Sequence, residues 1–365
     1  MKIKEIISCI ENFAPLRLQE LYDNSGLIIG DPEDVVSKAL ICIDVTEEVV
    51  NEAIKGKYDL IISHHPLIFG GIKKISKSDL TGKCIIKAIN NNIAIYAAHT
   101  NLDNILDGVN SILCQKIGLK NFTILKPQKN ILKKLVTYCP ADKADKVRNA
   151  LFEAGAGHIG NYDCCSFNTA GSGTFKALEN SKPYVGKINK LHFENEVKIE
   201  TVYPVFLEKK LLSALFESHP YEEVAYDIYS IENEYKKAGS GLVGEFEKQK
   251  NTKDFLIELK NILKIGAIRH TKITNKHTVK KVAICGGAGS FLINDAIAAG
   301  ADIFLTSDLK YHNFFEANDK MVIADIGHFE SEQFAKEILI KILNKKISTF
   351  AVQISKVNTN PICYL

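Results

Sequence analysis

Several features that mark other classes of protein are missing from this 365-residue sequence. Its nine cysteines are scattered and include no C-x-x-C pair, so neither a disulfide framework nor a thiolate zinc site is expected. No apolar run approaches the ~18 residues of a membrane span, and the N-terminal segment lacks the continuous apolar stretch of a secretory signal. The 46 basic and 43 acidic residues leave a formal charge of only +3, which offers no broad basic surface for duplex nucleic acid. A reducing cytoplasm, without membrane insertion, is the expected location.

Apolar strand patterns alternate with helical patterns in the N-terminal part of the chain. A strand expected at 39–43 precedes Thr46, a candidate helix N-cap, and a second strand at 58–62 leads into the sequence SHHP. A third strand, at 93–98, leads into His99. Strands that alternate with helices predict a mostly parallel sheet.

The C-terminal part of the chain repeats this plan. Strands are expected at 281–285, 302–305 and 321–325; the glycine turn GGAGS follows the first, and the sequences SDLKYH and GHFESE follow the others. In register, His99 matches His328, and an acidic residue follows each of them four positions later. The two parts are therefore interpreted as pseudo-symmetric α/β lobes whose strand ends meet in one crevice, where open α/β sheets bind ligands.

The middle of the chain has a different pattern. Two β-α-β halves in tandem, including a strand expected at 159–167, describe a ferredoxin-like domain. The stretch GSGTFKALENSKPYVGKINK between them is expected to be a long excursion that is either functional or an assembly contact. The predicted fold class is α/β, with two pseudo-symmetric lobes forming one discontinuous core that a ferredoxin-like α+β domain interrupts. The expected domain boundaries are 1–127, 128–232 and 233–365.

Side chains that divalent metals accept follow the strands at four places. Imidazole and carboxylate suit zinc, manganese and iron, and more of these groups are present than one tetrahedral ion needs, so two neighbouring ions are expected. Two ions about 3.5–4 Å apart lower the pKa of a shared water, which favours hydrolytic chemistry. The candidates are His64, His65, His99, Asp103, Asp308, His312, His328 and Glu332.

Several of these features allow more than one role. His99 is either a third imidazole ligand or an acid/base beside the metals. Asp308 and His312 suit orientation of the ligands or substrate contact as well as ligation. Glu332 is either a ligand or a partner of the helix N-terminus; if it lies in the first turn of the helix SEQFAKEILIKIL, its spacing from His328 still allows both to face the metals. The glycine turn at 286–290 is either a phosphate-binding nest or only a tight turn.

The motifs SHHPLIF, AAHTNLD, CGGAGS, TSDLKYH and GHFESE together resemble the GTP cyclohydrolase 1 type 2 homologue family, also called the Nif-three-like family, over essentially the whole chain. The sequences AGAGHIGNYDCCSF and HPYEEVAYDIY resemble the insert of its bacterial long form, which is similar to the PII and CutA folds. The resemblance implies a homohexamer, a trimer of dimers that forms a toroid around an internal cavity. It also implies two divalent ions, which could be zinc, manganese, iron or nickel, and His99 near them. The implied ligands are His64, His65, Asp103, His328 and Glu332.

Two functions are consistent with this resemblance. In the first, a metal-bound hydroxide attacks a nucleotide-like substrate, as in the opening of the guanine imidazole ring of GTP with loss of formate, and His99 shuttles protons. In the second, a non-enzymatic ring binds metal and a small metabolite or nucleic acid, and passes a signal through the insert. Metal-dependent turnover distinguishes the first from the second, and rapidly exchanging ions would instead indicate metal delivery or storage.

Overall fold

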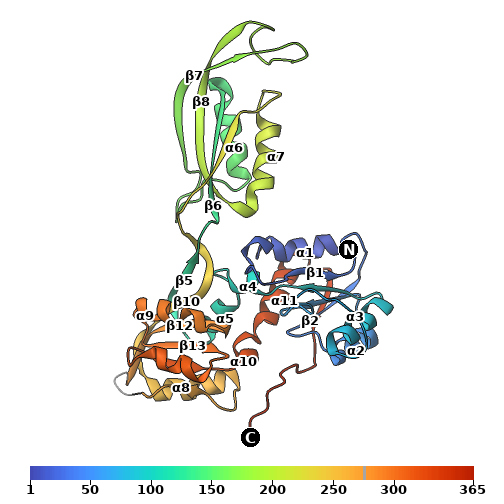
Figure 1. Ribbon diagram of the computed structural model, residues 1–365, viewed down its shortest axis with the longest axis vertical. Helices are drawn as coiled ribbons and strands as arrows, with labels where there is room; N and C mark the ends of the chain where they lie inside the picture. Colours follow the sequence, from blue (N-terminus) through green and yellow to red (C-terminus); the bar gives the residue numbers. More distant parts are fainter. Residues whose placement is uncertain (274–276) are drawn as a thin grey trace. The chain divides into compact units, whose positions relative to one another are not determined.

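A computed structural model describes residues 1–273 and 277–365 of the protein. They form two compact units, one made of Met1–Pro127 and Lys236–Leu365 and the other of Gln128–Tyr235. The larger unit contains a five-stranded and a six-stranded sheet, and the smaller unit contains a four-stranded sheet (Figure 1). The fold is therefore mixed α/β, as predicted. Within the described residues, no helix has both the length and the apolar character needed to cross a membrane.

The five-stranded sheet of the larger unit has the order β1-β4-β3-β2-β15. The last four strands run parallel, whereas β1 pairs antiparallel with β4 at the edge. Every residue of β3 and β4 is buried, which is typical of a parallel sheet with helices on both faces. The strands are β1 (Gly26–Ile29), β2 (Lys38–Cys42), β3 (Leu60–Ser63), β4 (Ala94–Ala97) and β15 (Ala351–Ile354). The helices beside them are α1 (Ile3–Glu11), α2 (Glu47–Gly56), α3 (Leu80–Asn90) and α11 (Ala335–Lys346).

Local sequence explains why α1 and α2 form. In α1 the buried residues are Ile3, Ile6 and Ile10, a spacing that places all three on one helical face. Thr46 caps α2 as predicted, because its hydroxyl accepts a hydrogen bond from the Val49 amide at 3.4 Å. The cap starts α2 shortly after the last residue of β2, so the turn that joins the strand to the helix is short.

The six-stranded sheet has the order β11-β14-β13-β12-β10-β5. Its central strands β12, β13 and β14 are parallel, and β10 and β11 run antiparallel to them. Val282 and Ile284 pack into the same core as α8, whereas Ala283 packs with α9, so alternate residues of β12 cover both faces. The strands are β5 (Lys120–Gln128), β10 (Tyr235–Asn251), β11 (Arg269–His270), β12 (Thr278–Ala288), β13 (Ile303–Ser307) and β14 (Val322–Asp325). The helices are α4 (Thr100–Asp103), α5 (Val109–Lys116), α8 (Thr252–Leu263), α9 (Ile293–Ala298) and α10 (His328–Glu332).

The two sheets of the larger unit exchange strands. β15, near the C-terminus, pairs with β2 of the N-terminal segment, with Ala351 opposite Lys38. In the other direction, β5 of the N-terminal segment forms the edge of the six-stranded sheet beside β10, and α5 contacts β12. The sequence patterns did not predict this exchange, which interlocks the two segments of the larger unit.

The smaller unit follows the order β6-α6-β7-β8-α7-β9, and its antiparallel sheet has the strand order β7-β8-β6-β9. Residues of α6 and α7 share one apolar core with Leu135 of β6 and Ile199 of β8, so both helices cover the same face of the sheet. In Figure 1 the two helices lie together beside the strands. The elements are β6 (Leu132–Pro140), α6 (Ala144–Glu153), β7 (Ser166–Lys176), β8 (Leu191–Pro204), α7 (Glu208–Ser218) and β9 (Tyr226–Ser230).

The hairpin of β7 and β8 corrects one expectation from the sequence. The strand expected at 159–167 begins only at Ser166. Gly160 and Cys164 both have positive φ, so the chain turns within the stretch where a strand was predicted. The hairpin extends into the first part of the stretch predicted as a long excursion, because β7 runs to Lys176 and β8 begins at Leu191.

Candidate metal centre

Two of the predicted ligands directly follow β3. His64 and His65 continue from its last residue, and their amides donate to the carbonyls of Cys42 and Ile43 at 3.1 and 2.9 Å. The His64 side chain is fully buried, and that of His65 is 15% exposed. Because β2 and β3 are parallel neighbours, these backbone bonds fix where both imidazoles leave the sheet edge.

His99 and Asp103 lie beyond the next strand of the same sheet. His99 follows β4 and precedes the short helix α4, which ends at Asp103. His64, His65 and His99 each contribute one ring nitrogen to a group of three, and these nitrogens lie within 4.8 Å of one another. The ends of β3 and β4 therefore bring three imidazoles together, as their parallel pairing requires.

The second sheet contributes His328 and Glu332 at the two ends of α10. Gly327, with φ of 77°, turns the chain into this helix after β14. The Nε2 of His328 lies 3.0 Å from Oε2 of Glu332 and 3.3 Å from Nε2 of His65. The Nε2 of His65 is 2.9 Å from the same Glu332 oxygen. All five predicted ligands and His99 thus belong to one cluster.

Glu332 occupies a different place from the predicted one. The expected helix over SEQFAKEILIKIL is divided, with α10 ending at Glu332 and α11 beginning at Ala335. α10 contacts β12 and β13, whereas α11 contacts α1 and β2, so the chain crosses from one sheet to the other at this break. Glu332 is therefore at the crossing and not in the first turn of a long helix.

One buried atom in the cluster lacks a partner. Among the described residues, none accepts from or donates to Nε2 of His64, which lies 3.6 Å from Oδ1 of Asp103 and 3.8 Å from Oε2 of Glu332. Buried polar atoms are almost always satisfied, and these separations are too long for hydrogen bonds. A cation between the nitrogen and the two carboxylates would satisfy all three groups. The donor set of imidazole nitrogen and carboxylate oxygen fits a divalent metal, so the cluster could hold metal ions.

The protonation of the cluster also reflects its crowding. Burial lowers the pKa of His64 to about 3, so that ring is neutral and able to ligate. Burial and the nearby Glu332 charge raise the pKa of Asp103 well above its usual range. Burial alone would lower the pKa of His65, but its bonds to Asp44 and Glu332 raise it to about 10. In the absence of an ion, protons on these groups compensate the buried carboxylate charge.

Each imidazole in the cluster is oriented by a group outside it. In all four rings the outer group contacts Nδ1, at 2.7–2.8 Å, so that Nε2 faces the cluster. Such outer partners fix the tautomer and the ring direction of metal-binding histidines. The pairs are His64 with the Ala98 carbonyl, His65 with Asp44, His99 with Asp23, and His328 with Asp308.

Asp23 is a functional candidate that sequence reasoning missed. Its buried carboxylate contacts Nδ1 of His99 at 2.8 Å and accepts from the Thr100 amide at 3.0 Å and the Ser25 hydroxyl at 2.8 Å. These bonds hold the pKa of Asp23 well below its usual range, although burial alone would raise it. Asp23 lies in a loop without a recognisable motif. Asp44 was missed as well, although it follows β2 at the same sheet edge as the histidines, and that position could have indicated it.

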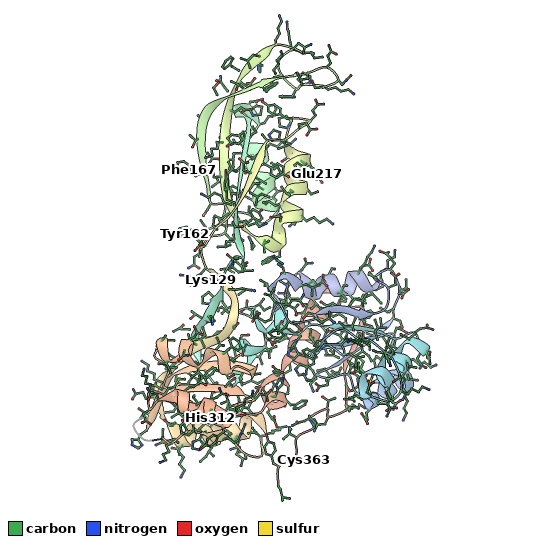
Figure 2. All side chains as sticks on the ribbon, viewed as in Figure 1. Lys129, Tyr162, Phe167, Glu217, His312 and Cys363 are labelled. Carbon is green, nitrogen blue, oxygen red and sulfur yellow. The ribbon has the colours of Figure 1, made fainter. Side chains whose placement is uncertain are left out.

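The two ambiguous residues of SDLKYH have different positions. Asp308, with φ of 57°, contacts His328 and so has an orienting position. His312, labelled in Figure 2, is exposed and packs its ring against Tyr311 at 5.3 Å between centroids. It belongs to none of the metal-type clusters among the described residues.

The glycine turn is already occupied by internal bonds. The Gly286 amide donates to Asn110 Oδ1 at 2.7 Å, and the Gly287 amide donates to the Ser331 hydroxyl at 3.0 Å. A Cβ at Gly287 would lie 2.2 Å from Oε1 of Glu332, and its φ is 64°. These contacts support the tight-turn alternative at Gly286 and Gly287, where the absence of a side chain makes room for the buried carboxylate.

A cavity of about 680 Å³ opens onto this cluster. His65, His99, Asp103, His328 and Glu332 all line it, as do residues of the C-terminal tail such as Asn360. This volume is within the range of small-molecule sites. The fold and the site thus define an α/β protein with a buried imidazole and carboxylate centre that opens into a ligand-sized cavity.

Comparison with known proteins identifies the family. The Duf34/NIF3 (NGG1p interacting factor 3) family matches residues 1–361, and the chain belongs to this family. The resemblance seen in the sequence motifs is confirmed.

Several relatives match along their full lengths. A Bacillus subtilis (strain 168) protein named GTP cyclohydrolase 1 type 2 homolog is 38% identical over 371 residues, covering 99% of this chain and 98% of that protein. The crystal structure of a Bacillus cereus protein related to NIF3 superposes with a TM-score of 0.87 at 38% identity, covering 100% of this chain and 99% of the other. For Staphylococcus aureus protein SA1388 the TM-score is 0.78 at 31% identity, with coverage of 100% and 99%.

Proposed function

We propose that this protein is a dinuclear metal-dependent hydrolase. Two divalent ions, zinc, manganese, iron or nickel, would be held by His64, His65, Asp103, His328 and Glu332. The observation that carries the proposal is the buried, unpartnered Nε2 of His64 facing two carboxylates among the described residues. A site with mixed nitrogen and oxygen donors that opens into a cavity is typical of catalytic metals, whereas structural zinc sites are usually closed and rich in cysteine.

The bound ions would supply an activated water and would stabilise negative charge that develops on the substrate. The chain's own residues then have separate tasks. His99 would shuttle protons at Nε2, because its Nδ1 is engaged by Asp23. Asp44 and Asp308 would keep the rings of His65 and His328 in place.

The reaction we propose is attack of water on a nucleotide-like substrate, of the GTP cyclohydrolase type. The support is the name of the relatives, GTP cyclohydrolase 1 type 2 homolog, at 38% identity over nearly the full chain. Such a reaction opens the guanine imidazole ring and releases formate. The cavity provides space for a heterocycle beside the cluster.

The experiment combines elemental analysis of the purified protein with turnover of GTP and a nucleotide panel. Wild type is compared with His64→Ala and Glu332→Ala, and His312→Ala serves as the matched control because His312 is exposed outside the cluster. We expect about two ions per chain, the number that hydrolytic dinuclear sites hold. Both cluster variants should lose metal and turnover while the control keeps them. A wild type that binds no metal would refute the proposal.

A second candidate is a non-enzymatic regulatory ring, favoured by the inserted unit. We propose that residues 128–232 form a ferredoxin-like, PII/CutA-like domain between lobes 1–127 and 233–365. Its strand order, and helices on a single face, support this. Phe167, labelled in Figure 2, is 68% exposed on β7, which suits an assembly contact in a cytoplasmic homohexamer arranged as a trimer of dimers. Two bound metals without turnover would favour this candidate, with a metabolite or nucleic acid as its ligand.

A further inference from the structure

The charge of the cavity is the first observation. Five carboxylates line it, and among the described residues that line it there is neither lysine nor arginine. Two divalent ions carry four positive charges, so even a fully loaded centre would leave the cavity without a positive excess. The five carboxylates belong to Glu20, Asp44, Asp103, Asp308 and Glu332.

Two lysines that contact rings lining the cavity do not change this balance. Lys126 lies 6.0 Å from the centre of the Phe291 ring, but its amine pairs with Asp295 at 3.2 Å. Lys336 lies 5.9 Å from the centre of the Phe329 ring. Neither lysine lines the cavity itself. Apart from metal ions, phosphate groups are normally held by arginine, lysine or free backbone amides. No lysine or arginine lines the cavity among the described residues, and the amides of Gly286 and Gly287 in the glycine turn are already bonded.

The third observation is the apolar lining. Five large side chains line the cavity and remain more than half exposed in the single chain. Flat heterocycles stack on such surfaces without regard to charge. One of them, Phe69, meets the His99 ring edge-on at 5.4 Å between centroids, so this surface continues to the metal cluster. The five are Tyr22, Phe69, Leu80, Phe291 and Ile362, exposed by 67, 52, 53, 54 and 57%.

We propose that this cavity selects a flat, uncharged heteroaromatic ring, such as a nucleobase or nucleoside, and disfavours its phosphorylated forms. The inference rests on the proposed hydrolase function and narrows its nucleotide-like substrate to the unphosphorylated base or nucleoside. Apolar walls would bind the ring, and the surplus of carboxylates would repel phosphate, so selectivity comes from repulsion as much as from attraction.

The test is calorimetric binding of guanosine, GMP and GTP to metal-loaded protein, with metal content checked after each titration. Guanosine should bind at least about tenfold more tightly than GTP, since like charges in a cavity weaken association. The direction in which salt changes the GTP affinity distinguishes repulsion from attraction more clearly than the affinity ratio does. Raising potassium chloride from about 0.05 to about 0.5 M should strengthen GTP binding severalfold and leave guanosine within about twofold, because salt screens repulsion.

A carboxylate variant provides the internal control. Glu20→Gln keeps the size of a side chain that accepts a hydrogen bond from Asn104 Nδ2 at 2.9 Å. Because it removes one negative charge, it should reduce the ratio of guanosine affinity to GTP affinity by about two- to fivefold. Glu247→Gln removes an exposed carboxylate on β10 and should leave the ratio of guanosine affinity to GTP affinity unchanged. GTP that binds as tightly as guanosine, with an affinity that falls with salt, overturns the inference, and so does the failure of all three ligands to bind.

Turnover is measured separately on the same samples. If the binding order holds but no compound is hydrolysed, the hydrolase proposal fails and the ligand class stands. If GTP is both bound and hydrolysed in preference to guanosine, the ligand class fails and the hydrolase proposal stands.

Discussion

Replacement of Asp23 by asparagine tests how the cluster is supported. The buried Asp23 carboxylate accepts from the Thr100 amide and the Ser25 hydroxyl and contacts Nδ1 of His99. Asparagine has the same shape but replaces one acceptor oxygen with an NH₂ donor, so either the Thr100 amide loses its acceptor or the His99 ring must change tautomer. Losing a hydrogen bond to a buried charged group costs about 1.5–3 kcal/mol. We expect Asp23→Asn to lower the free energy of unfolding of the metal-free protein by about 2–3 kcal/mol.

The same change should alter the proton position on His99. With the carboxylate present, the ring donates from Nδ1 and its Nε2 is free to accept a proton. If the NH₂ group of the variant faces Nδ1, that nitrogen becomes the acceptor and Nε2 carries the proton instead. Outer partners of this kind typically contribute about 10- to 100-fold to metal affinity or activity, and we expect a loss of that size.

The effect on stability should depend on pH. Bonds to His99 and neighbouring groups hold the pKa of Asp23 well below its usual range, despite its burial. A depressed folded-state pKa adds stability above the unfolded pKa, and this stability is lost as the pH falls. The difference between wild type and Asp23→Asn should therefore be complete at neutral pH and narrow below about pH 4.

Urea unfolding at several pH values measures the stability, and ¹⁵N imidazole NMR measures the tautomer of His99. Asp107→Asn is the control, because Asp107 is exposed in the same segment of the chain. The reasoning is wrong if Asp23→Asn unfolds within about 0.5 kcal/mol of wild type, the range of ordinary surface substitutions, and keeps the wild-type tautomer.

Four further predictions concern the ions, the turn, the tail and the insert. Chelation should lower the calorimetric melting temperature, because a ligand at a hundredfold excess over its Kd stabilises by about 2.7 kcal/mol, and an unchanged melting temperature would contradict bound ions. Gly287→Ala should weaken metal binding more than tenfold by titration, since its Cβ would lie 2.2 Å from Oε1 of Glu332; wild-type affinity would exclude this clash. Thr359→Val removes a 2.6 Å bond to Asp44 and should cost about 1 kcal/mol in urea unfolding, whereas no loss would mean that the tail is not held there. Phe167→Glu should reduce the mass seen by analytical ultracentrifugation without loss of metal, and an unchanged mass would remove Phe167 from the assembly contact.

The parts of the site that sequence predicted are those that depend on local pattern and parallel pairing. Thr46 as a helix cap and His64 after β3 both follow from short apolar runs with recognisable ends. Parallel neighbours end at the same sheet edge, so His64 and His99 had to converge once their strands were identified. These inferences need no knowledge of distant contacts.

The parts that sequence missed depend on contacts between distant residues. The pairing of β15 with β2 joins Ala351 to Lys38, and the apolar pattern of either strand contains no information about its partner. Asp23 contacts His99 from a loop without periodicity. The break before Ala335 falls within a sequence of continuous helical pattern, because tertiary packing of α11 against the other sheet overrides local propensity.

The strand exchange also explains why the centre lies where it does. Glu332 ends α10 on the six-stranded sheet, and within three residues the chain begins α11 beside the five-stranded sheet, so this carboxylate is held at the crossing. Beyond α11, β15 pairs with β2, and the tail then donates from Thr359 to Asp44, the carboxylate that orients His65. The C-terminal segment therefore supplies two candidate ligands directly, His328 and Glu332, and supports the orientation of His65 through Thr359 and Asp44. A change that weakens the packing of this segment should also weaken metal binding, because the cluster forms only when both sheets and their exchanged strands are in place.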